Sequence, residues 1–519
     1  MNISTKLTKQ FMTSVTSLSL AVLLVPAAYA QTPPAPAPGR NVPQGAPQDP
    51  GTKETSISKV ERKNRAPVSK DVLRVKLPKP VEAKLDNGMT ALVMEDHRFP
   101  TVSVQFNIAG AGALYEPTEM AGLADVTAQM LREGTKTRTA RQIAEEIDRE
   151  GATLNASSGF GSSATTMFAS GLSDNFDQWF SLATDVLLNP TFPADQVAKF
   201  KQRLKIGLRQ QRAQPTFLAN ERFSRAVYGT YPAAIVSATD ASIDAITPEA
   251  LRRWHAERYA PQNTILGIAG DVKASELIPK LNAMLSAWKK TDAKEVLPPN
   301  PTPVTAKKIY LVDRPNSVQT NLVLGNIAID RRDPDYIPFV VMNRIVGGGA
   351  AARLFINLRE NKGYTYGAYS NFTALKYPGP WRATSEVRTP VTEGAMTEFF
   401  NEIRRIRDER VPQDELEASE RSLVANFALS LESPEQLLGY AITQKIYGLP
   451  ADYWDTYPAK ILAVTADDVQ RVARKYINPD NIQVVAVGDA SKIKAVLEKF
   501  GPVEVYDLSG NVVMNKPQQ

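Results

Sequence analysis

The sequence predicts an α+β fold built from two homologous domains, each a two-layer arrangement of one sheet and its helices. The first observation is an internal repeat, in which Pro261 and Gly270 recur as Pro479 and Gly488, in both cases 218 residues later. The second is that segments with strand periodicity are followed by long helical stretches, as expected for a sheet layer packed on a helix layer. The third is a Pro-rich segment, 291–305, that indicates a linker between two halves. Since this repeat is far longer than a solenoid unit, we interpret it as a duplicated domain.

The first 30 residues have the features of a secretory signal peptide. Lys6 and Lys9 precede an apolar run at 18–25, and residues 28–30 (Ala-Tyr-Ala) fit a cleavage site. The run is too short to remain as a membrane-spanning helix, so no transmembrane segment is predicted. The chain has no cysteine, which excludes disulfides, thiolate metal sites and a lipid-bearing cysteine. We expect an exported protein, periplasmic if the source is a Gram-negative bacterium.

Residues 31–80 are predicted to form a linker, Pro-rich at first and then basic. Between Lys53 and Lys79, nine Lys and Arg residues stand against three acidic residues. Such a segment is more often a solvated spacer than a surface for anionic lipid or an acidic partner. No basic stripe with interleaved aromatic residues follows it, so nucleic-acid binding is not expected.

The N-terminal domain is predicted to span 81–290. Asn87-Gly88 indicates a tight hairpin turn, because glycine readily adopts the positive φ that such a turn needs. The segment 100–108 alternates apolar and polar residues, which predicts a half-buried strand. Helices are predicted at 122–131, 139–150, 174–188 and 194–213.

Residues 122–135 (GLADVTAQMLREGT) resemble the zinc helix of the pitrilysin/insulinase metallopeptidases, the inverzincins. That family carries H-x-x-E-H within a frame similar to G-x-x-H-x-x-E-H-M-L-x-x-G-T. Here Asp125, Ala128 and Gln129 stand where the first His, the Glu and the second His would be. Two His at i and i+4 can hold one Zn²⁺, and the Glu then acts as general base. With Asp, Ala and Gln at these positions, we predict a degenerate zinc site and no metal bound by this chain.

The sequence pattern indicates no other metal ligands. The family's third ligand is a Glu on a later helix, and counting along the chain leads near Gly207, but no Asp or Glu lies in 196–220. The chain has two histidines, His97 in a predicted turn and His255 in a predicted helix. A lone histidine is more often a packing or surface residue than a ligand. A variant metal site through Asp125 is therefore the least favoured alternative.

The segment Asn155, Ala156 and Ser157 resembles the family's edge strand beside the zinc helix. In the family, such a strand captures a peptide by strand addition. Gly159 and Gly161 follow it and would loosen that edge. An ordinary strand followed by a loop is an equally good interpretation.

The C-terminal domain is predicted to span 306–505, with a tail at 506–519. Its run from Gly347 to Tyr369 predicts a helix that ends at Gly363, followed by a strand. A phosphate-binding role for the three glycines at 347–349 is weak, because no Lys-Ser/Thr follows them. The run is similar to the family's second-domain motif, which implies that Arg359 and Tyr366 bind the substrate carbonyl and the oxyanion in a shared site. Packing of the Tyr and a helix-dipole role for the Arg are the alternatives.

The resemblance covers most of 81–499 and implies two domains that face each other across a cavity. It also implies divided labour, since processing-peptidase-like members commonly work as two unlike subunits. The favoured hypothesis is a non-catalytic subunit that binds a zinc-bearing homologous partner and a peptide substrate, with zinc on the partner. A structural or peptide-binding homologue with no peptidase role is the main alternative, and a stand-alone peptidase with a variant metal site is the third.

Overall fold

The computed structural model describes residues 73–513 of the 519-residue chain. The predicted signal peptide at 1–30 and most of the predicted linker at 31–80 lie outside the described residues. Within the described part, Val75 and Leu77 pack on aromatic residues of the C-terminal half. The Leu77 N–H also donates to Asp455 Oδ1 at 2.9 Å.

The N-terminal half contains a six-stranded mixed sheet in the order β1-β2-β6-β3-β5-β4. Strands β2 and β6 are parallel, and the other neighbours are antiparallel. The strands are β1 (Val81–Lys84), β2 (Thr90–Glu95), β3 (Thr101–Ala109), β4 (Thr153–Ser157), β5 (Ala164–Leu172) and β6 (Thr264–Gly270). The helices are α1 (Leu123–Met130), α2 (Ala140–Arg149), α3 (Phe176–Leu188), α4 (Ala194–Arg212), α5 (Pro215–Tyr228), α6 (Asp240–Ala245), α7 (Pro248–Arg258) and α8 (Ala274–Met284).

The C-terminal half repeats this plan with a sheet in the order β12-β7-β11-β8-β10-β9, except that its edge strand β12 pairs in parallel with β7. The strands are β7 (Lys308–Asp313), β8 (Gln319–Ile329), β9 (Thr365–Phe372), β10 (Gly379–Arg388), β11 (Gln483–Gly488) and β12 (Val503–Tyr506). The helices are α9 (Tyr336–Val346), α10 (Arg353–Phe355), α11 (Thr392–Asp408), α12 (Gln413–Ser430), α13 (Pro434–Tyr447), α14 (Tyr453–Leu462), α15 (Ala466–Tyr476) and α16 (Ala490–Glu498). The predicted duplication and the α+β fold class are confirmed.

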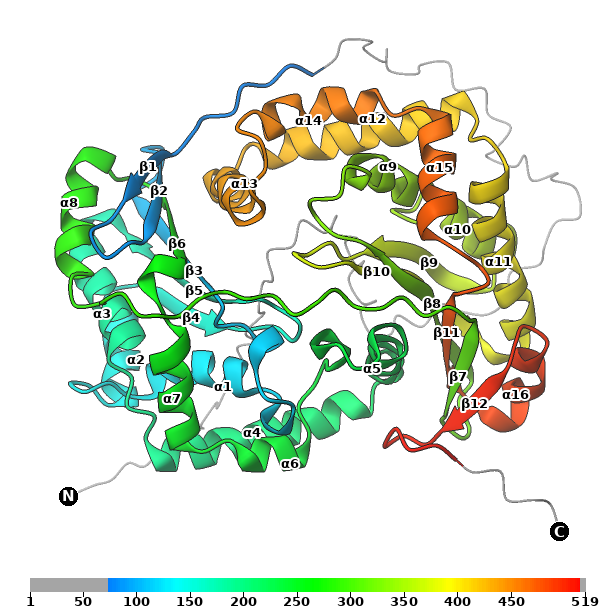
Figure 1. The fold of residues 1–519 in the computed structure, drawn as a ribbon, viewed down its shortest axis with the longest axis horizontal. Helices are drawn as coiled ribbons and strands as arrows, with labels where there is room; N and C mark the ends of the chain where they lie inside the picture. Colours follow the sequence, from blue (N-terminus) through cyan, green and yellow to red (C-terminus); the bar gives the residue numbers. More distant parts are fainter. Residues whose placement is uncertain (1–72, 514–519) are drawn as a thin grey trace, which may run out of the picture.

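The two halves exchange one helix each. Helix α5 of the N-terminal half packs on β8 and β11, while α13 of the C-terminal half packs on β2 and β6 (Figure 1). The two helices begin at equivalent points of the repeat, with Pro215 and Pro434 each in the first turn. Each sheet therefore has its own helices on its outer face and a helix of the other half on part of its inner face.

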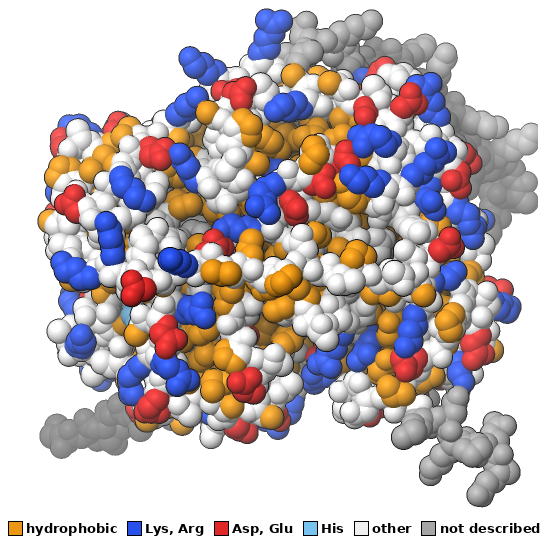
Figure 2. Space-filling view, viewed as in Figure 1, with side chains coloured by type: hydrophobic (Ala, Val, Ile, Leu, Met, Phe, Trp, Pro, Cys, Tyr) orange, Lys and Arg blue, Asp and Glu red, His pale blue; other side chains and the backbone are white. Residues whose placement is uncertain are grey.

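The Pro-rich linker crosses the junction between the halves. It follows α8 in an extended path to β7, and its apolar side chains lie along the middle of the face drawn in Figure 2. Glu295 in this linker accepts a hydrogen bond from Tyr115 of the N-terminal half at 3.3 Å. The same carboxylate forms a 2.5 Å ion pair with Lys376 of the C-terminal half. The linker thus ties both halves together.

The local predictions explain much of this architecture. Gly88 has φ +88° in the turn between β1 and β2, which confirms the predicted hairpin. The apolar residues of β3 (Val102, Val104, Phe106 and Ile108) are fully buried on one face of the strand. One helix differs from the expectation, because α10 continues as a π-helical segment, Ile356–Asn361, before Gly363 ends it with φ +62°.

Backbone pairing in the C-terminal half continues past residue 505. Strand β12 reaches Tyr506, and the Val513 N–H then donates to the Val505 carbonyl at 2.8 Å. Among residues 73–513, no helix combines the length and apolar character that crossing a membrane requires.

Candidate functional site

Helix α1 carries the degenerate zinc motif and is held at its start by a buried carboxylate. Gly122 precedes the helix with φ +101°. Glu116 accepts hydrogen bonds from the Gly122 N–H at 2.7 Å and the Ala124 N–H at 2.9 Å. Burial raises the pKa of Glu116 to about 7, although these two hydrogen bonds oppose the shift. This carboxylate therefore satisfies two donors at the first turn of the helix.

The first and third positions of the motif bind each other. The Gln129 amide donates to Asp125 Oδ2 at 2.6 Å, and the Ser158 N–H donates to Asp125 Oδ1 at 3.0 Å. Burial raises the pKa of Asp125, and the bonds from Ser158 and Gln129 act against that shift. Ala128, at the position of the family's general base, is buried and apolar. The motif positions are thus part of an internal hydrogen-bond network.

The side chains at this site do not fit a catalytic zinc ion. Zinc enzymes use three protein ligands drawn from His, Cys, Asp and Glu, and leave one position open. No group of three or more such side chains could hold a metal ion anywhere in residues 73–513. Glu221 on α5 is the first acidic residue after α4, and its carboxylate pairs with Arg212 at 2.8 Å and accepts from Ser237 at 3.0 Å.

Both histidines have other partners. His97 lies in the turn after β2 and pairs with Asp271 at 2.6 Å. His255 on α7 donates through Nε2 to the Leu187 carbonyl at 2.8 Å and packs against the ring of Tyr259. Burial lowers the pKa of His255 to about 4, so this ring is neutral at physiological pH. These contacts match the packing and surface roles expected from the sequence.

Asn155, Ala156 and Ser157 lie on β4, at the edge of the N-terminal sheet. Both ends of this edge are already hydrogen-bonded. The Leu154 carbonyl accepts from Arg132 at 3.3 Å, and the Ser158 N–H donates to Asp125. Because outward-facing backbone groups alternate along an antiparallel edge, Ala156 lies between these two positions with its own N–H and C=O facing outward.

The C-terminal motif is much more exposed. The Tyr366 side chain is 92% exposed. Arg359 lies on the π-helical segment, forms a 2.5 Å ion pair with Glu360 and stacks on Phe355, with its Cζ atom 4.9 Å from the ring centroid. The Tyr369 ring lies 5.5 Å from that of Phe355. In the described part of the chain, Tyr366 has no hydrogen-bond partner, and neither residue of the Arg359 and Tyr366 pair bonds to α1.

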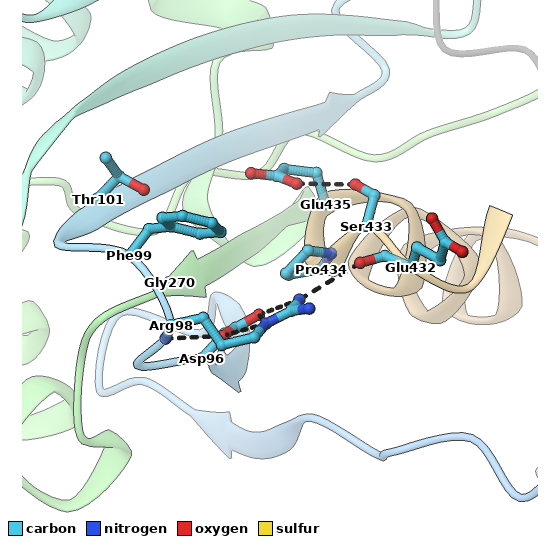
Figure 3. Close-up of a pocket in the computed structure, with 9 residues that line it drawn as sticks. All are labelled: Asp96, Arg98, Phe99, Thr101, Gly270, Glu432, Ser433, Pro434 and Glu435. Atoms are coloured by element: carbon cyan, nitrogen blue, oxygen red, sulfur yellow. Dashed lines mark hydrogen bonds and ion pairs between the residues drawn. The ribbon is translucent and has the colours of Figure 1, made fainter. Parts of the chain in front are cut away.

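A cleft of about 260 Å³ lies at the junction of the halves, between the turn after β2 and the start of α13 (Figure 3). Its charged groups pair with one another. Arg98 binds Asp96 at 2.6 Å and the Glu432 carbonyl at 3.3 Å, and Ser433 donates to Glu435 at 2.8 Å. These contacts join the β2–β3 turn to the α12–α13 loop, so the cleft is part of the contact between the halves.

Sequence reasoning missed Glu116, Arg132 and the Ser158 N–H. Glu116 and Ser158 lie outside the zinc-helix frame, Arg132 occupies one of its variable positions, and the bond from Ser158 to Asp125 joins residues 33 positions apart. An acidic residue shortly before a helix that begins with Gly122 was a weak signal for Glu116. No sequence pattern indicated the bonds of Arg132 and Ser158 at the edge of β4.

Comparison with known proteins places these features in a family. The insulinase (peptidase family M16) family model matches residues 91–238, and the model described as the peptidase M16 inactive domain matches residues 245–423. The chain is 26% identical over 412 residues to an uncharacterized zinc protease of Rickettsia felis, covering 76% of this chain and 94% of the relative. It is 21% identical to the non-peptidase homolog YmxG of Helicobacter pylori, covering 77% of this chain and 92% of the relative.

Solved structures agree with this assignment. The crystal structure of a peptidase M16 inactive domain from Pseudomonas fluorescens matches with a TM-score of 0.73 and 28% identity, over 79% of this chain and 98% of that chain. A protease from Helicobacter pylori matches with a TM-score of 0.72 and 19% identity, over 79% of this chain and all of that chain, and supports the fold. The chain therefore belongs to the pitrilysin/insulinase peptidase family M16, as a homologue that lacks the zinc-binding motif.

Proposed function

We propose that this protein is the non-catalytic subunit of an exported zinc metallopeptidase of the pitrilysin/insulinase type. In this proposal, it supplies Arg359 and Tyr366 to a site whose zinc ion is held by a homologous partner subunit, and it binds no metal itself. The exposure of Tyr366 carries the proposal. A tyrosine that is 92% exposed and has no partner within the described chain is available to a substrate or to another subunit.

The chemistry of the pair suits an oxyanion. Arg359 brings charged donors in a fixed fork, and Tyr366 brings a neutral hydroxyl donor. Arg359 is half-exposed and stacks on Phe355, so its guanidinium is oriented without being buried. The π-helical turn that carries it is an unusual local geometry that often occurs at functional sites.

The test is reconstitution with the zinc-bearing homologue from the same organism, first identified by isolating the native complex. We expect peptide hydrolysis by the mixture and by neither chain alone. Arg359→Ala and Tyr366→Phe are each expected to lower kcat by about 10²-fold or more while assembly is unchanged. Arg209→Ala is the matched control, because Arg209 is exposed on α4 and remote in the sequence from the motif. Full activity of both motif variants in the mixture would contradict the proposal.

A structural or peptide-binding homologue with no peptidase role is the second candidate. It is favoured by the internal bonds of α1 and of the β4 edge, which occupy the groups that the family's active members use. The H. pylori relative described as a non-peptidase homolog also supports it. Isolation of the chain in a native assembly that hydrolyses no peptide would favour this candidate.

A stand-alone peptidase with a variant metal site is the least supported candidate, because the donor set does not fit. Metal analysis of the purified protein tests it directly. Stoichiometric zinc in the isolated chain, removed by Asp125→Ala, would revive it.

A further inference from the structure

The inner face of the N-terminal sheet presents a compact set of uncharged polar side chains, which we name the inner-face platform. Its strands β3, β5 and β4 are neighbours in the sheet, and each contributes alternate residues to the same face. The platform consists of Ser103, Gln105 and Asn107 on β3, Thr166, Phe168 and Ser170 on β5, and Thr153, Asn155 and Ser157 on β4.

The strand register sets these residues in three rows across the sheet. The middle row is Gln105, Phe168 and Asn155, and the rows on either side of it contain hydroxyl and amide side chains. Residues in a row are cross-strand neighbours, and successive rows are about 6.8 Å apart along the strands. The platform is therefore a single apolar ring surrounded by neutral hydrogen-bonding groups.

Much of the hydrogen-bonding capacity of the platform is unused. The side chains of Gln105, Asn107, Thr166 and Ser157 are half-buried or exposed, and they form no hydrogen bond within residues 73–513. Exchanged helix α13 packs on β2 and β6, beside the platform. Two charged residues touch the platform, Glu435 at Ser103 (3.4 Å) and Arg132 at Asn155 (3.4 Å).

The inner face of the C-terminal sheet is different. There, Arg382 is charged and binds Asn371 at 2.9 Å and Asn220 of α5 at 2.8 Å, beneath the exchanged helix. Thr384 and Tyr369 in the next row also form no side-chain hydrogen bond within residues 73–513, but charged Arg382 lies beside them. A face that is uncharged over three neighbouring strands is thus specific to the N-terminal half.

We propose that the inner-face platform binds an extended, uncharged polar segment of polypeptide. Its amides both donate and accept, as peptide groups and the side chains of Ser, Thr, Asn and Gln do. An extended chain repeats every two residues with the spacing of the platform rows. A charged side chain of either sign would lose hydration at the centre of the platform, where no opposite charge replaces it. The two charged neighbours, Glu435 at β3 and Arg132 at β4, have opposite signs and lie at opposite edges.

This inference deepens the proposed function, on which it rests, by naming the substrate class of the shared site. Binding on the sheet face also differs from capture of a peptide at the β4 edge alone. Because Arg132 and Asp125 occupy both ends of that edge, added strand pairing is restricted to the region of Ala156. The face of the sheet then provides most of the contact.

Fluorescence anisotropy with the isolated chain tests the proposal. The probes are a fluorescein-labelled peptide of Ser, Thr, Asn and Gly, and two peptides of equal length with Lys or Glu at alternate positions. We expect the neutral peptide to bind at least about tenfold more tightly than either charged peptide. Phe168→Ala is expected to lower the affinity for the neutral peptide by about tenfold.

Adding charge to the platform distinguishes a local effect of the platform on peptide binding from an effect of the protein's net charge. The double variant Gln105→Glu with Asn107→Asp keeps side-chain shape and adds two negative charges on the platform. The double variant is expected to lower the affinity for the neutral peptide by about tenfold and to raise the affinity for the Lys peptide by a similar factor. The matched control, Gln210→Glu with Gln211→Glu, adds the same charge on the exposed surface of α4 and should leave all three affinities unchanged.

Equal binding of the three peptides, no binding of any, or the same shift in the control would overturn the inference. A thermal melt of each variant shows whether it is folded. These titrations need no zinc-bearing partner. Suppose that the peptides do not bind as expected, while Arg359→Ala still lowers the activity of the reconstituted enzyme. That result would reject this inference and leave the proposed function in place.

Discussion

The two halves of this protein share one architecture and differ in which of their polar groups are satisfied. In the N-terminal half, the motif positions Asp125 and Gln129 bind each other and the neighbouring strand. In the C-terminal half, Tyr366 is left without an internal partner and Arg359 is half-exposed. The inner faces of the sheets also differ, because the N-terminal face is uncharged over β3, β5 and β4, whereas the C-terminal face carries the hydrogen-bonded Arg382.

The comparison teaches that a helix without metal ligands can use the same positions for structural contacts. Asp125 and Gln129, at two of the family's ligand positions, form a hydrogen-bonded contact between α1 and the end of β4. Arg359 and Tyr366 in the other half remain exposed, and neither bonds to α1 within residues 73–513. In the proposed function, these exposed groups make the C-terminal half the one that contributes to chemistry.

The largest expected effect comes from a substitution that disrupts the packing of an exchanged helix. Phe223 on α5 is fully buried against the C-terminal sheet. Phe223→Ala is expected to lower the free energy of unfolding by about 3–5 kcal/mol, because it opens a cavity between the halves. Urea unfolding followed by circular dichroism measures this change.

The matched variant on the other exchanged helix is Leu438→Ala, for which a loss of about 2–5 kcal/mol is expected. Since each half covers the sheet of the other, both variants should unfold in one transition. Two separated transitions would contradict mutual stabilisation by the exchanged helices.

The second effect concerns the motif contact of the N-terminal half. Asp125→Ala removes the acceptor of both the Ser158 N–H and the Gln129 amide. We expect a loss of about 1–3 kcal/mol in the free energy of unfolding, with faster hydrogen exchange at the Ser158 amide. Asp125→Asn keeps one carbonyl acceptor and should cost less. Unchanged stability and exchange in Asp125→Ala would show that the contact has no structural role.

The third effect is the pH dependence that comes from His255, which has no counterpart in the other half. The position equivalent to His255 in the second repeat is Ala473. Burial lowers the folded-state pKa of His255 to about 4, below its unfolded value, so the unfolded chain binds more protons between pH 6.5 and 4. His255 should therefore reduce stability as the pH falls through this window, by on the order of 1 kcal/mol.

Comparison of unfolding at pH 7 and pH 5 in the wild type and in His255→Phe measures this contribution. The variant should be less stable at pH 7, because the Leu187 carbonyl loses its donor, and its stability should depend less on pH. An equal slope in both proteins would contradict the assignment.

The smallest expected effect is that of Tyr366→Phe on stability. An exposed hydroxyl without an internal partner should change the free energy of unfolding by less than about 0.5 kcal/mol. Tyr377→Phe is the contrast in the same half, because Tyr377 is buried and donates to the Gly161 carbonyl at 2.7 Å. It should cost about 1 kcal/mol. A similar cost for both variants would remove the distinction between free and satisfied groups.

Much of the fold and part of the site could be predicted from the sequence. The alternation in 100–108 gave β3, and Asn87-Gly88 gave the first hairpin. The segment at 155–157 was expected at a sheet edge, and β4 lies there. The π-helical turn at Arg359 was not predicted, because one extra residue in a helical turn leaves the apolar pattern of Leu354 and Leu358 unchanged.

The sequence by itself determined the duplication, the α+β class and the loss of the metal ligands, since residue periodicity, a fixed repeat offset and side-chain chemistry are local information. Only the tertiary structure decided that α5 and α13 are exchanged, that Asp125 binds the end of β4, and that Tyr366 remains free. These features depend on contacts between residues far apart in the chain. Such contacts are set by how whole layers pack, and no short segment of sequence encodes that packing on its own.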